Sequence, residues 1–232
     1  SNTIIPDGIV RIEDMAFGEY DCSTLDLPNS VVSIGDYNFQ QWIQNQPDGL
    51  VYAGKVLLKY KGEMPENTSV RLKEGTIGIA ASAFEYCSNL VSIDIPNSIT
   101  CIGQNTFLEC TGLTSVTIPN SVTCIEDGVF DGCSNLTSVT LPNNLQTIGW
   151  DAFSGCKKLK SIEIPNSVTA IGGSAFNDCD SLVSIFLPSE LTQINRGLFQ
   201  SCGNLTSIII PEKVETIGVF AFSGCSSLIS VI

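Results

Sequence analysis

A 23-residue unit recurs along most of this chain and constrains its fold more than any other feature. Residues 118–140, IPNSVTCIEDGVFDGCSNLTSVT, are followed directly by residues 141–163, LPNNLQTIGWDAFSGCKKLKSIE, with Pro, Phe, Cys, Leu and Ser at the same offsets. The phenylalanines of this period are Phe84, Phe107, Phe130, Phe153, Phe176, Phe199 and Phe222. A fixed period of this length indicates a repeat architecture, because one unit cannot bury its apolar side alone whereas stacked units can.

Nine units account for almost the whole chain. Beginning each unit one residue before the proline gives residues 72–94, 95–117, 118–140, 141–163, 164–186, 187–209 and 210–232, with Lys73 replacing the proline of the first. Residues 5–26 form a 22-residue version, and residues 27–71 form one unit that carries about 22 extra residues. We therefore expect a single domain, residues 1–232, of about nine coils.

Each unit reads as one turn of a flattened coil. The segment from Ser115 to Ile118 alternates in polarity, as a half-buried strand does, and proline then ends it because proline donates no ladder hydrogen bond. A second extended piece, Val122 to Ile125, returns, and glycines such as Gly149 are expected to permit a sharp bend. The A-F-x-x-C piece is too short for a full helix, so a single helical or 3₁₀ turn is expected.

Cysteine belongs to the repeat. Of ten cysteines, seven are spaced by 23 residues: Cys87, Cys110, Cys133, Cys156, Cys179, Cys202 and Cys225. Stacked coils place neighbouring sulfurs near disulfide range, but parallel side chains point the same way, which makes a bridge awkward. Cysteine also behaves as a small buried apolar residue, so we expect a row of free thiols that fill space in the core.

Composition excludes several classes of function. The chain is 43% hydrophobic with a formal net charge of −13, so it has a core but repels nucleic acid and anionic membranes. No apolar stretch approaches the roughly 18 residues of a membrane span. The N-terminal sequence SNTIIPDGIV has no basic start followed by an apolar run, so either there was no signal peptide or it is absent from this chain. Histidine is absent, as are the GxSxG, P-loop and dinucleotide-binding motifs and any tight cysteine pair. We expect no catalytic residue, no cofactor and no metal site.

The repeat resembles the BspA-type leucine-rich repeats of bacterial surface proteins. The residues that carry the resemblance are LTSVTIPNSVTCIEDGVFDGC and its copies, and they cover about residues 5–232. The resemblance implies a right-handed leucine-rich-repeat solenoid of parallel strands, at a cell surface or secreted, in a role of adhesion or ligand capture. Host or bacterial surface proteins or glycans are the implied partners, and the family has no shared catalytic residues to transfer.

Outward positions of the main strand are the first candidates for binding. Ser115 and Thr117 are expected to point away from the core, on the presumed concave face. The Thr117 position varies from coil to coil: Asp26, Arg71, Asp94, Thr117, Thr140, Glu163, Phe186, Ile209 and Ile232. Because exposed apolar residues often mark interfaces, Phe186 and Ile209 with nearby Val183 are the first-choice binding site. The alternative is that these residues only reflect an incomplete end of the solenoid.

The break in the period, about residues 44–68, is the second candidate. Residues 50–60, LVYAGKVLLKY, predict a β-hairpin around Ala53 and Gly54. Trp42, Tyr52 and Tyr60 lie in or beside it and form the second-choice binding site. The structural alternative is that the hairpin packs over the N-terminal coils and covers their edge.

These features favour a non-enzymatic binding module that presents a long face to protein or glycan ligands. The alternative is a structural spacer that holds another domain away from the cell. An enzyme is disfavoured because the residues that catalysis needs are missing.

Overall fold

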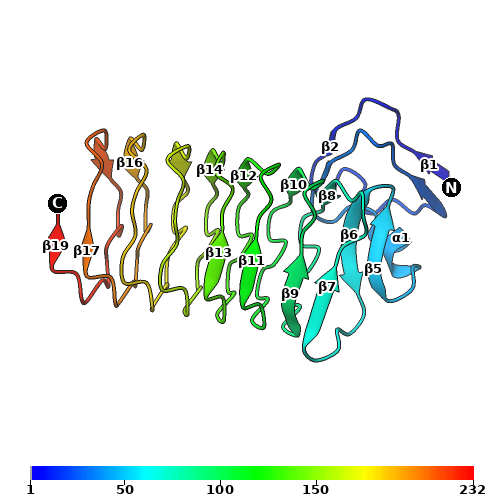
Figure 1. Cartoon of the computed structure of the whole chain (residues 1–232). Helices are drawn as coiled ribbons and strands as arrows, with labels where there is room; N and C mark the ends of the chain where they lie inside the picture. The colour runs from blue at the N-terminus through cyan, green and yellow to red at the C-terminus, as the bar shows by residue number, and fades with distance from the viewer. Residues whose placement is uncertain (1) are drawn as a thin grey trace.

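The computed structural model describes residues 2–232 and is a parallel β-solenoid of about ten turns with almost no helix. Figure 1 shows the coils side by side in one row, with the N-terminus at one end and the C-terminus at the other. The predicted solenoid is confirmed, and its number of turns is close to the nine expected from the units.

The main strands stack in the order of the sequence along one side of the row. They are β1 (Asn2–Ile4), β3 (Thr24–Asp26), β7 (Thr68–Arg71), β9 (Leu90–Asp94), β11 (Ser115–Thr117), β13 (Ser138–Thr140), β17 (Ser207–Ile208) and β19 (Ser230–Val231). Pairing is parallel and one repeat apart, as in Ser115 with Ser138. Residues 161–163 and 184–186 differ from the expectation of full strands, since only one isolated parallel bridge, between Glu163 and Phe186, is formed there.

Short strands form the second side of each coil. They are β2 (Arg11–Ile12), β4 (Ser33–Ile34), β8 (Gly78–Ile79), β10 (Cys101–Ile102), β12 (Cys124–Ile125), β14 (Thr147–Ile148), β15 (Ala170–Ile171), β16 (Gln193–Ile194) and β18 (Thr216–Ile217). Glycine follows many of them because neighbouring coils approach closely. A Cβ on Gly172 would lie 2.4 Å from the backbone nitrogen of Trp150, and its φ is not in the left-handed region. Close approach, rather than the bend that we expected, explains this glycine.

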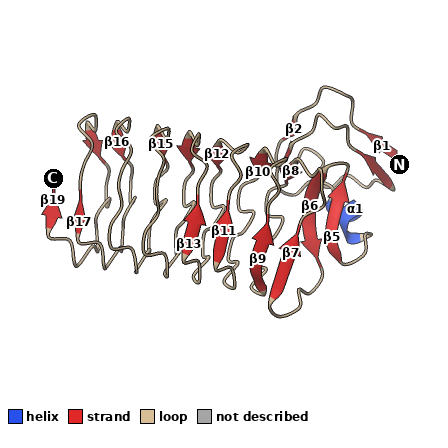
Figure 2. Ribbon diagram, in the orientation of Figure 1, coloured by secondary structure: helices blue, strands red, loops and turns tan. Residues whose placement is uncertain are grey.

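The A-F-x-x-C pieces form the third side, drawn as tan loops in Figure 2. The expected helical turn is replaced here by successive tight turns with two left-handed residues per coil, such as Asn105 (φ 54°) and Glu109 (φ 55°). Alternate N–H groups point to the next coil, so that Phe107 N donates to Val129 O at 2.9 Å. The backbone groups that a helix would pair internally are thus paired between coils.

Aromatic rings run through the core as a continuous stack. The rings of Phe84, Phe107, Phe130, Phe153, Phe176, Phe199 and Phe222 follow one another with centroids 5.4–5.8 Å apart and planes within 15° of parallel. All but Phe222 are fully buried. The repeat period therefore places one ring in every coil directly on the ring of the coil before it.

A short helix that we did not expect, α1 (Gln40–Gln44), leads into the insertion, which contains the predicted hairpin, β5 (Gly49–Ala53) and β6 (Val56–Lys61). The two strands are antiparallel, and β6 also pairs parallel with β8. Residues of β6 alternate between two separate cores: Val56 and Leu58 belong to the N-terminal core, and Leu57 belongs to the large C-terminal core. The hairpin therefore lies between the two cores. Figure 1 shows its strands beside β7 and β8.

Candidate functional site

The candidate site is the outward surface of the main strands, which we call the strand face. Val116 is buried while Ser115 and Thr117 are exposed, so the predicted alternation is confirmed in this coil. The residues at the Thr117 position of each coil, from Asp26 to Ile232, form what we call the variable column, and all nine are exposed. A ligand lying along the strand face would therefore meet side chains whose character changes along the solenoid.

The variable column changes from charged to apolar along the solenoid. At one end Arg71 Nε lies 3.7 Å from Asp94 Oδ2, and both side chains are largely in solvent, so the pair contributes about 0–1 kcal/mol. Further along, Phe186 is 76% exposed, Ile209 57% and Val183 46%. We call these three residues the apolar patch.

The residues of the apolar patch are all exposed and come from two adjacent coils. Phe186 and Ile209 occupy the same position of adjacent coils, and Val183 precedes Phe186 by three residues along the chain. Ile229 and Ile232 are also exposed, at the positions equivalent to Val183 and Phe186 two coils further on. Contiguous exposed apolar surface of this kind is typical of interaction sites.

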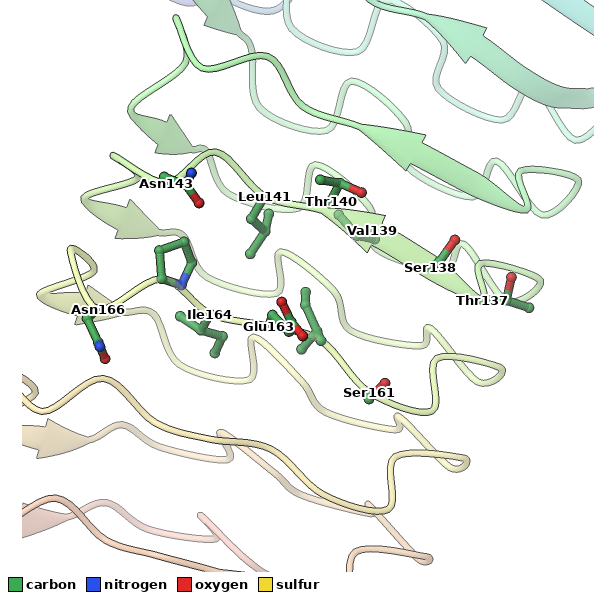
Figure 3. A pocket seen from close by; sticks show the side chains of 12 residues that line it. Thr137, Ser138, Val139, Thr140, Leu141, Asn143, Ser161, Glu163, Ile164 and Asn166 are labelled. Carbon is green, nitrogen blue, oxygen red and sulfur yellow. The ribbon is translucent and has the colours of Figure 1, made fainter.

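Beside the apolar patch, a groove of about 550 Å³ opens between β13 and residues 161–166. Its lining includes Ser138 and Thr140 from one coil and Ser161 and Glu163 from the next, as Figure 3 shows. In residues 2–232, no backbone hydrogen bond joins β13 to residues 160–164. The groove therefore lies at one of the interruptions of the ladder between the main strands; another separates β9 from β11.

Sequence reasoning did not single out this groove. Its residues Ser138, Ser161, Asn143 and Asn166 belong to the repeated pattern. Serine stands at the Ser115 position of every coil from Ser69 to Ser230, and we interpret this serine row as structural. The only signal was the change from Thr140 to Glu163 at one outward position. The interruption of the ladder itself has no sequence signature.

A second groove of about 500 Å³ lies over β7, β9 and β11. It is lined by Arg71, Asp94 and Thr117 from the charged end of the variable column, together with the serines of these strands. Ser92 donates to Ser69 across it at 2.8 Å, which supports the interpretation of the serine row as structural in these coils.

The second-choice residues of the insertion are held in packing contacts. The ring of Tyr60 lies 6.4 Å from that of Phe84, and Tyr52 accepts a hydrogen bond from Lys73 N at 3.0 Å. Trp42 packs against the N-terminal core. All three are half-buried, so their side chains support the structural role of the hairpin more than a binding role.

The thiols of the row are free, and they also act as donors, which we did not foresee. No disulfide links any of the cysteines, all of which lie in the described residues 2–232. Cys156 Sγ lies 3.3 Å from Phe130 O in the preceding coil, and Cys133 makes the same contact with Phe107 at 3.2 Å. Burial raises the pKa of the Cys156 thiol well above its ordinary value, so the protonated donor form persists.

Replacing Cys156 by Ala is expected to lower the free energy of unfolding by about 1–3 kcal/mol, because a buried side chain and its contact to Phe130 O are both lost. Denaturant unfolding measures the loss, and ligand binding should not change.

Thiol titration of the unfolded, unreduced protein should find most of the ten cysteines free. Four or more disulfides in that titration would contradict the free-thiol row.

Other polar residues that resemble functional groups have structural partners. Asn135 and Asn204, both in N-x-S/T sequences, donate to the carbonyls of Thr111 and Asp180 in the preceding coil at 2.6 and 2.7 Å. Asp127, which follows Glu126 in the sequence, accepts a hydrogen bond from Trp150 N at 2.7 Å. These groups satisfy backbone donors and acceptors between coils.

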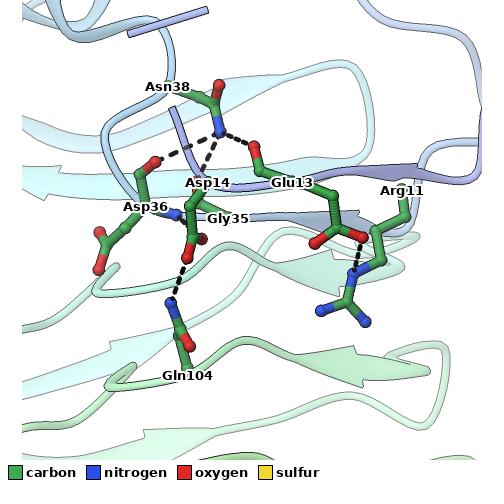
Figure 4. A network of polar contacts seen from close by, with 7 residues as sticks. All are labelled: Arg11, Glu13, Asp14, Gly35, Asp36, Asn38 and Gln104. Atoms are coloured by element: carbon green, nitrogen blue, oxygen red, sulfur yellow. Dashed lines mark hydrogen bonds and ion pairs between the residues drawn. The ribbon is translucent and has the colours of Figure 1, made fainter. Parts of the chain in front are cut away.

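A polar network joins the N-terminal coils to the rest of the solenoid (Figure 4). Asp14 accepts from Asp36 N at 2.7 Å and from Gln104 Nε2 at 3.0 Å, although Gln104 lies 90 residues away. Buried Asn38 donates to the carbonyls of Glu13 and Gly35. Asp14 thus serves as a link between coils, and no side chain of the network needs a ligand to be satisfied.

Within residues 2–232, no group of three or more Cys, Asp or Glu side chains has the geometry of a metal site. No described helix has the length and hydrophobicity needed to span a bilayer.

The sequence pattern of the BspA type leucine rich repeat region matches residues 1–46, 63–164 and 146–232, in six copies. The unmatched residues, 47–62, correspond to the hairpin. No functionally curated protein matches the sequence.

Several solved structures are similar. The leucine-rich repeat protein of T. pallidum is 36% identical, with a TM-score of 0.70 over 75% of this chain and 82% of that one. A leucine-rich repeat protein of Eubacterium ventriosum is 21% identical, with a TM-score of 0.68 over 94% of this chain and 59% of that one, and this likeness shows the fold alone. The pneumococcal vaccine antigen PcpA is 20% identical, with a TM-score of 0.50 over 100% of this chain and 61% of that one, which again shows only the fold. On the match of its repeats, the chain belongs to the BspA-type leucine-rich repeat family.

Proposed function

We infer that this protein is a non-enzymatic binding module, displayed at a cell surface or secreted, that captures a protein or glycan of a host or bacterial surface. The observation that carries the inference is the exposed Phe186 beside Ile209 on a face where neighbouring coils carry Thr140 and Glu163. A large aromatic side chain that is exposed on the strand face does not stabilise the core, but it offers contact area to a partner.

The similar proteins support a location at the surface. One solved structure that matches this chain is named as a leucine rich cell surface protein of Faecalibacterium prausnitzii, and PcpA is named as a vaccine antigen. Such names describe those proteins. For this chain they support display outside the cell as part of the proposal.

The second candidate function is a structural spacer. Its support is the regularity of the core, where one phenylalanine stack and one row of thiols repeat with little change from coil to coil. A spacer needs only this core, whereas the variable column changes from Thr140 to Glu163, Phe186 and Ile209. The variation of the strand face therefore favours binding over a purely structural role.

Changing Phe186 to Ser together with Ile209 to Thr should weaken binding at the apolar patch by at least about tenfold, because burying a Phe side chain at an interface is worth about 1.5–3 kcal/mol. The fold should survive, since both side chains are exposed and Thr117 and Thr140 occupy the same position in other coils. Binding to immobilised host matrix proteins and to a glycan array measures the effect.

A spacer predicts a different result from the same variant. All ligands of the wild type would bind normally, and only self-association of the solenoid would fall. A loss of the melting transition would contradict both functions, because it would mean that these side chains stabilise the core.

A further inference from the structure

The groove between β13 and residues 161–166 has unpaired backbone groups along its floor. In neighbouring coils, Thr137 N donates to Thr114 O and Ile118 N donates to Thr140 O, each at 2.9 Å. The equivalent bonds one coil further on, from Lys160 N to Thr137 O and from Leu141 N to Glu163 O, are absent in the described part of the chain. Backbone donors and acceptors at such an interruption must be satisfied by water or by a ligand.

The walls of the groove carry neutral hydrogen-bonding groups and one negative charge. Ser138 and Thr140 offer hydroxyl groups on one side, and Ser161 and Glu163 offer a hydroxyl and a carboxylate on the other (Figure 3). No Lys or Arg is among the residues that line it. Exposed Lys160 adjoins Ser161 but is not in the lining, whereas Glu163 is. Because of this carboxylate and the net charge of −13 of the whole chain, phosphate, sulfate and carboxylate ligands are disfavoured.

An exposed aromatic ring borders this polar groove. Phe186 pairs with Glu163 in the parallel bridge, so the two residues are next to each other on adjacent coils. Both are exposed on the strand face. A ligand in the groove that extends toward the C-terminus would therefore meet a flat apolar surface directly beside a carboxylate.

This combination selects a ligand with two kinds of surface. The ligand needs hydroxyl groups, which both donate and accept hydrogen bonds. Such groups match the serine and threonine hydroxyls of the groove, the Glu163 carboxylate, which only accepts, and the unpaired backbone groups. It also needs a flat apolar side to lie on the phenyl ring. A pyranose sugar has both, since its ring presents C–H groups on one face and hydroxyls around its rim. The volume of about 550 Å³ is of the size of small-molecule sites and accommodates a short oligosaccharide.

Resting on the proposed binding function, we propose that this groove is a binding site for neutral glycans, with Phe186 as the stacking platform for one sugar ring and Glu163, Thr140 and Ser138 as its hydrogen-bonding partners. The site extends from the apolar patch toward the N-terminus. In it Phe186 stacks on a sugar ring, which is a more specific role than contributing apolar contact area. A protein ligand at the apolar patch is the competing occupant, and the two differ in what they require of residue 186.

The test uses the full chain and a panel of neutral glucan, mannan, galactan and chitin oligosaccharides, with binding followed by calorimetry and by saturation-transfer NMR. Phe186→Leu keeps an apolar side chain but removes the flat ring, so glycan binding should weaken by about threefold to tenfold. Phe186→Tyr keeps the ring and should bind nearly as the wild type does. Glu163→Gln should weaken binding by about tenfold, because a carboxylate accepts stronger hydrogen bonds than an amide.

The repeat supplies matched controls. Asp26 occupies the same outward position as Glu163 in an N-terminal coil and is exposed, so Asp26→Asn removes an equivalent charge far from the groove. Tyr86 is an exposed aromatic residue at a position where Ser201 stands in a later coil, so Tyr86→Ser removes a ring elsewhere with little strain. Neither control should change glycan binding.

The outcomes separate this proposal from the binding function on which it rests. If no oligosaccharide of the panel binds, yet Phe186→Ser with Ile209→Thr weakens capture of a protein and Phe186→Leu does not, the glycan site is wrong and the binding module stands. If Asp26→Asn weakens glycan binding as much as Glu163→Gln does, the effect does not come from the groove and the groove is excluded. If the wild type binds neither class, both proposals fail.

Discussion

Changing Phe153 to Ala should lower the free energy of unfolding by about 3–5 kcal/mol, the largest effect that we expect from any single substitution. Phe153 is fully buried, and its ring lies 5.4 Å from that of Phe130 and 5.5 Å from that of Phe176, with planes nearly parallel. Truncation removes both stacking contacts and leaves a cavity that neighbouring coils cannot close, because their backbones are fixed by hydrogen bonds between coils. Denaturant unfolding gives the loss directly.

Two further phenylalanines serve as controls for this prediction. Phe222 lies at the end of the stack, half-buried and in contact with Phe199 alone among the stacked rings, so Phe222→Ala should cost clearly less. Phe186 is exposed, and Phe186→Ala should change stability by no more than about 0.5 kcal/mol. Equal losses at Phe153 and Phe222 would mean that the stack does not hold the coils together.

Leu57 and Leu58, neighbours on β6, should report on different parts of the molecule when each is changed to Ala. Both are buried, so each change should cost about 2–5 kcal/mol in the core that it contacts. Leu57 faces the large C-terminal core and Leu58 faces the N-terminal core. Leu58→Ala should therefore loosen mainly the coils before the hairpin, and Leu57→Ala those after it.

Native-state hydrogen exchange measures the difference coil by coil. In a solenoid each unit contacts only its neighbours, so the effect of a substitution should decline with distance from the altered coil. If both variants accelerate exchange equally in all coils, the chain unfolds as one unit, which is the single domain that the sequence predicts for residues 1–232. The two separate cores favour the local result.

The arrangement within a coil follows from the sequence. The alternation around Val116 places Ser115 and Thr117 outward, and the repeated offset of Phe153 and Cys156 places ring and thiol inside. These features depend on side chains only a few residues apart, and their repetition at a fixed spacing confirms each interpretation several times. The exposure of Phe186, and with it the first-choice binding site, was predicted on that basis.

The relations between coils were decided by the tertiary structure. Three contacts join residues of different coils. The backbone of a neighbouring coil lies so close to Gly172 that no side chain fits there, the Cys156 thiol donates a hydrogen bond to Phe130 O, and Gln104 donates one to Asp14. Spacing between coils results from the packing of every neighbouring layer together, so no local pattern encodes it. For the same reason the hairpin was recognised in the sequence, while its position between two cores was not.

The groove beside Glu163 depends both on features visible in the sequence and on relations between coils. Its side chains are visible in the sequence as outward positions of the repeat, but their meaning depends on an interrupted ladder between β13 and residues 161–163. The sequence by itself determined a leucine-rich-repeat solenoid and the column of residues that it presents to solvent. Only the tertiary structure decided where the ladder between main strands is interrupted, because that depends on the balance of hydrogen bonds and core packing between layers, which a single repeat does not contain.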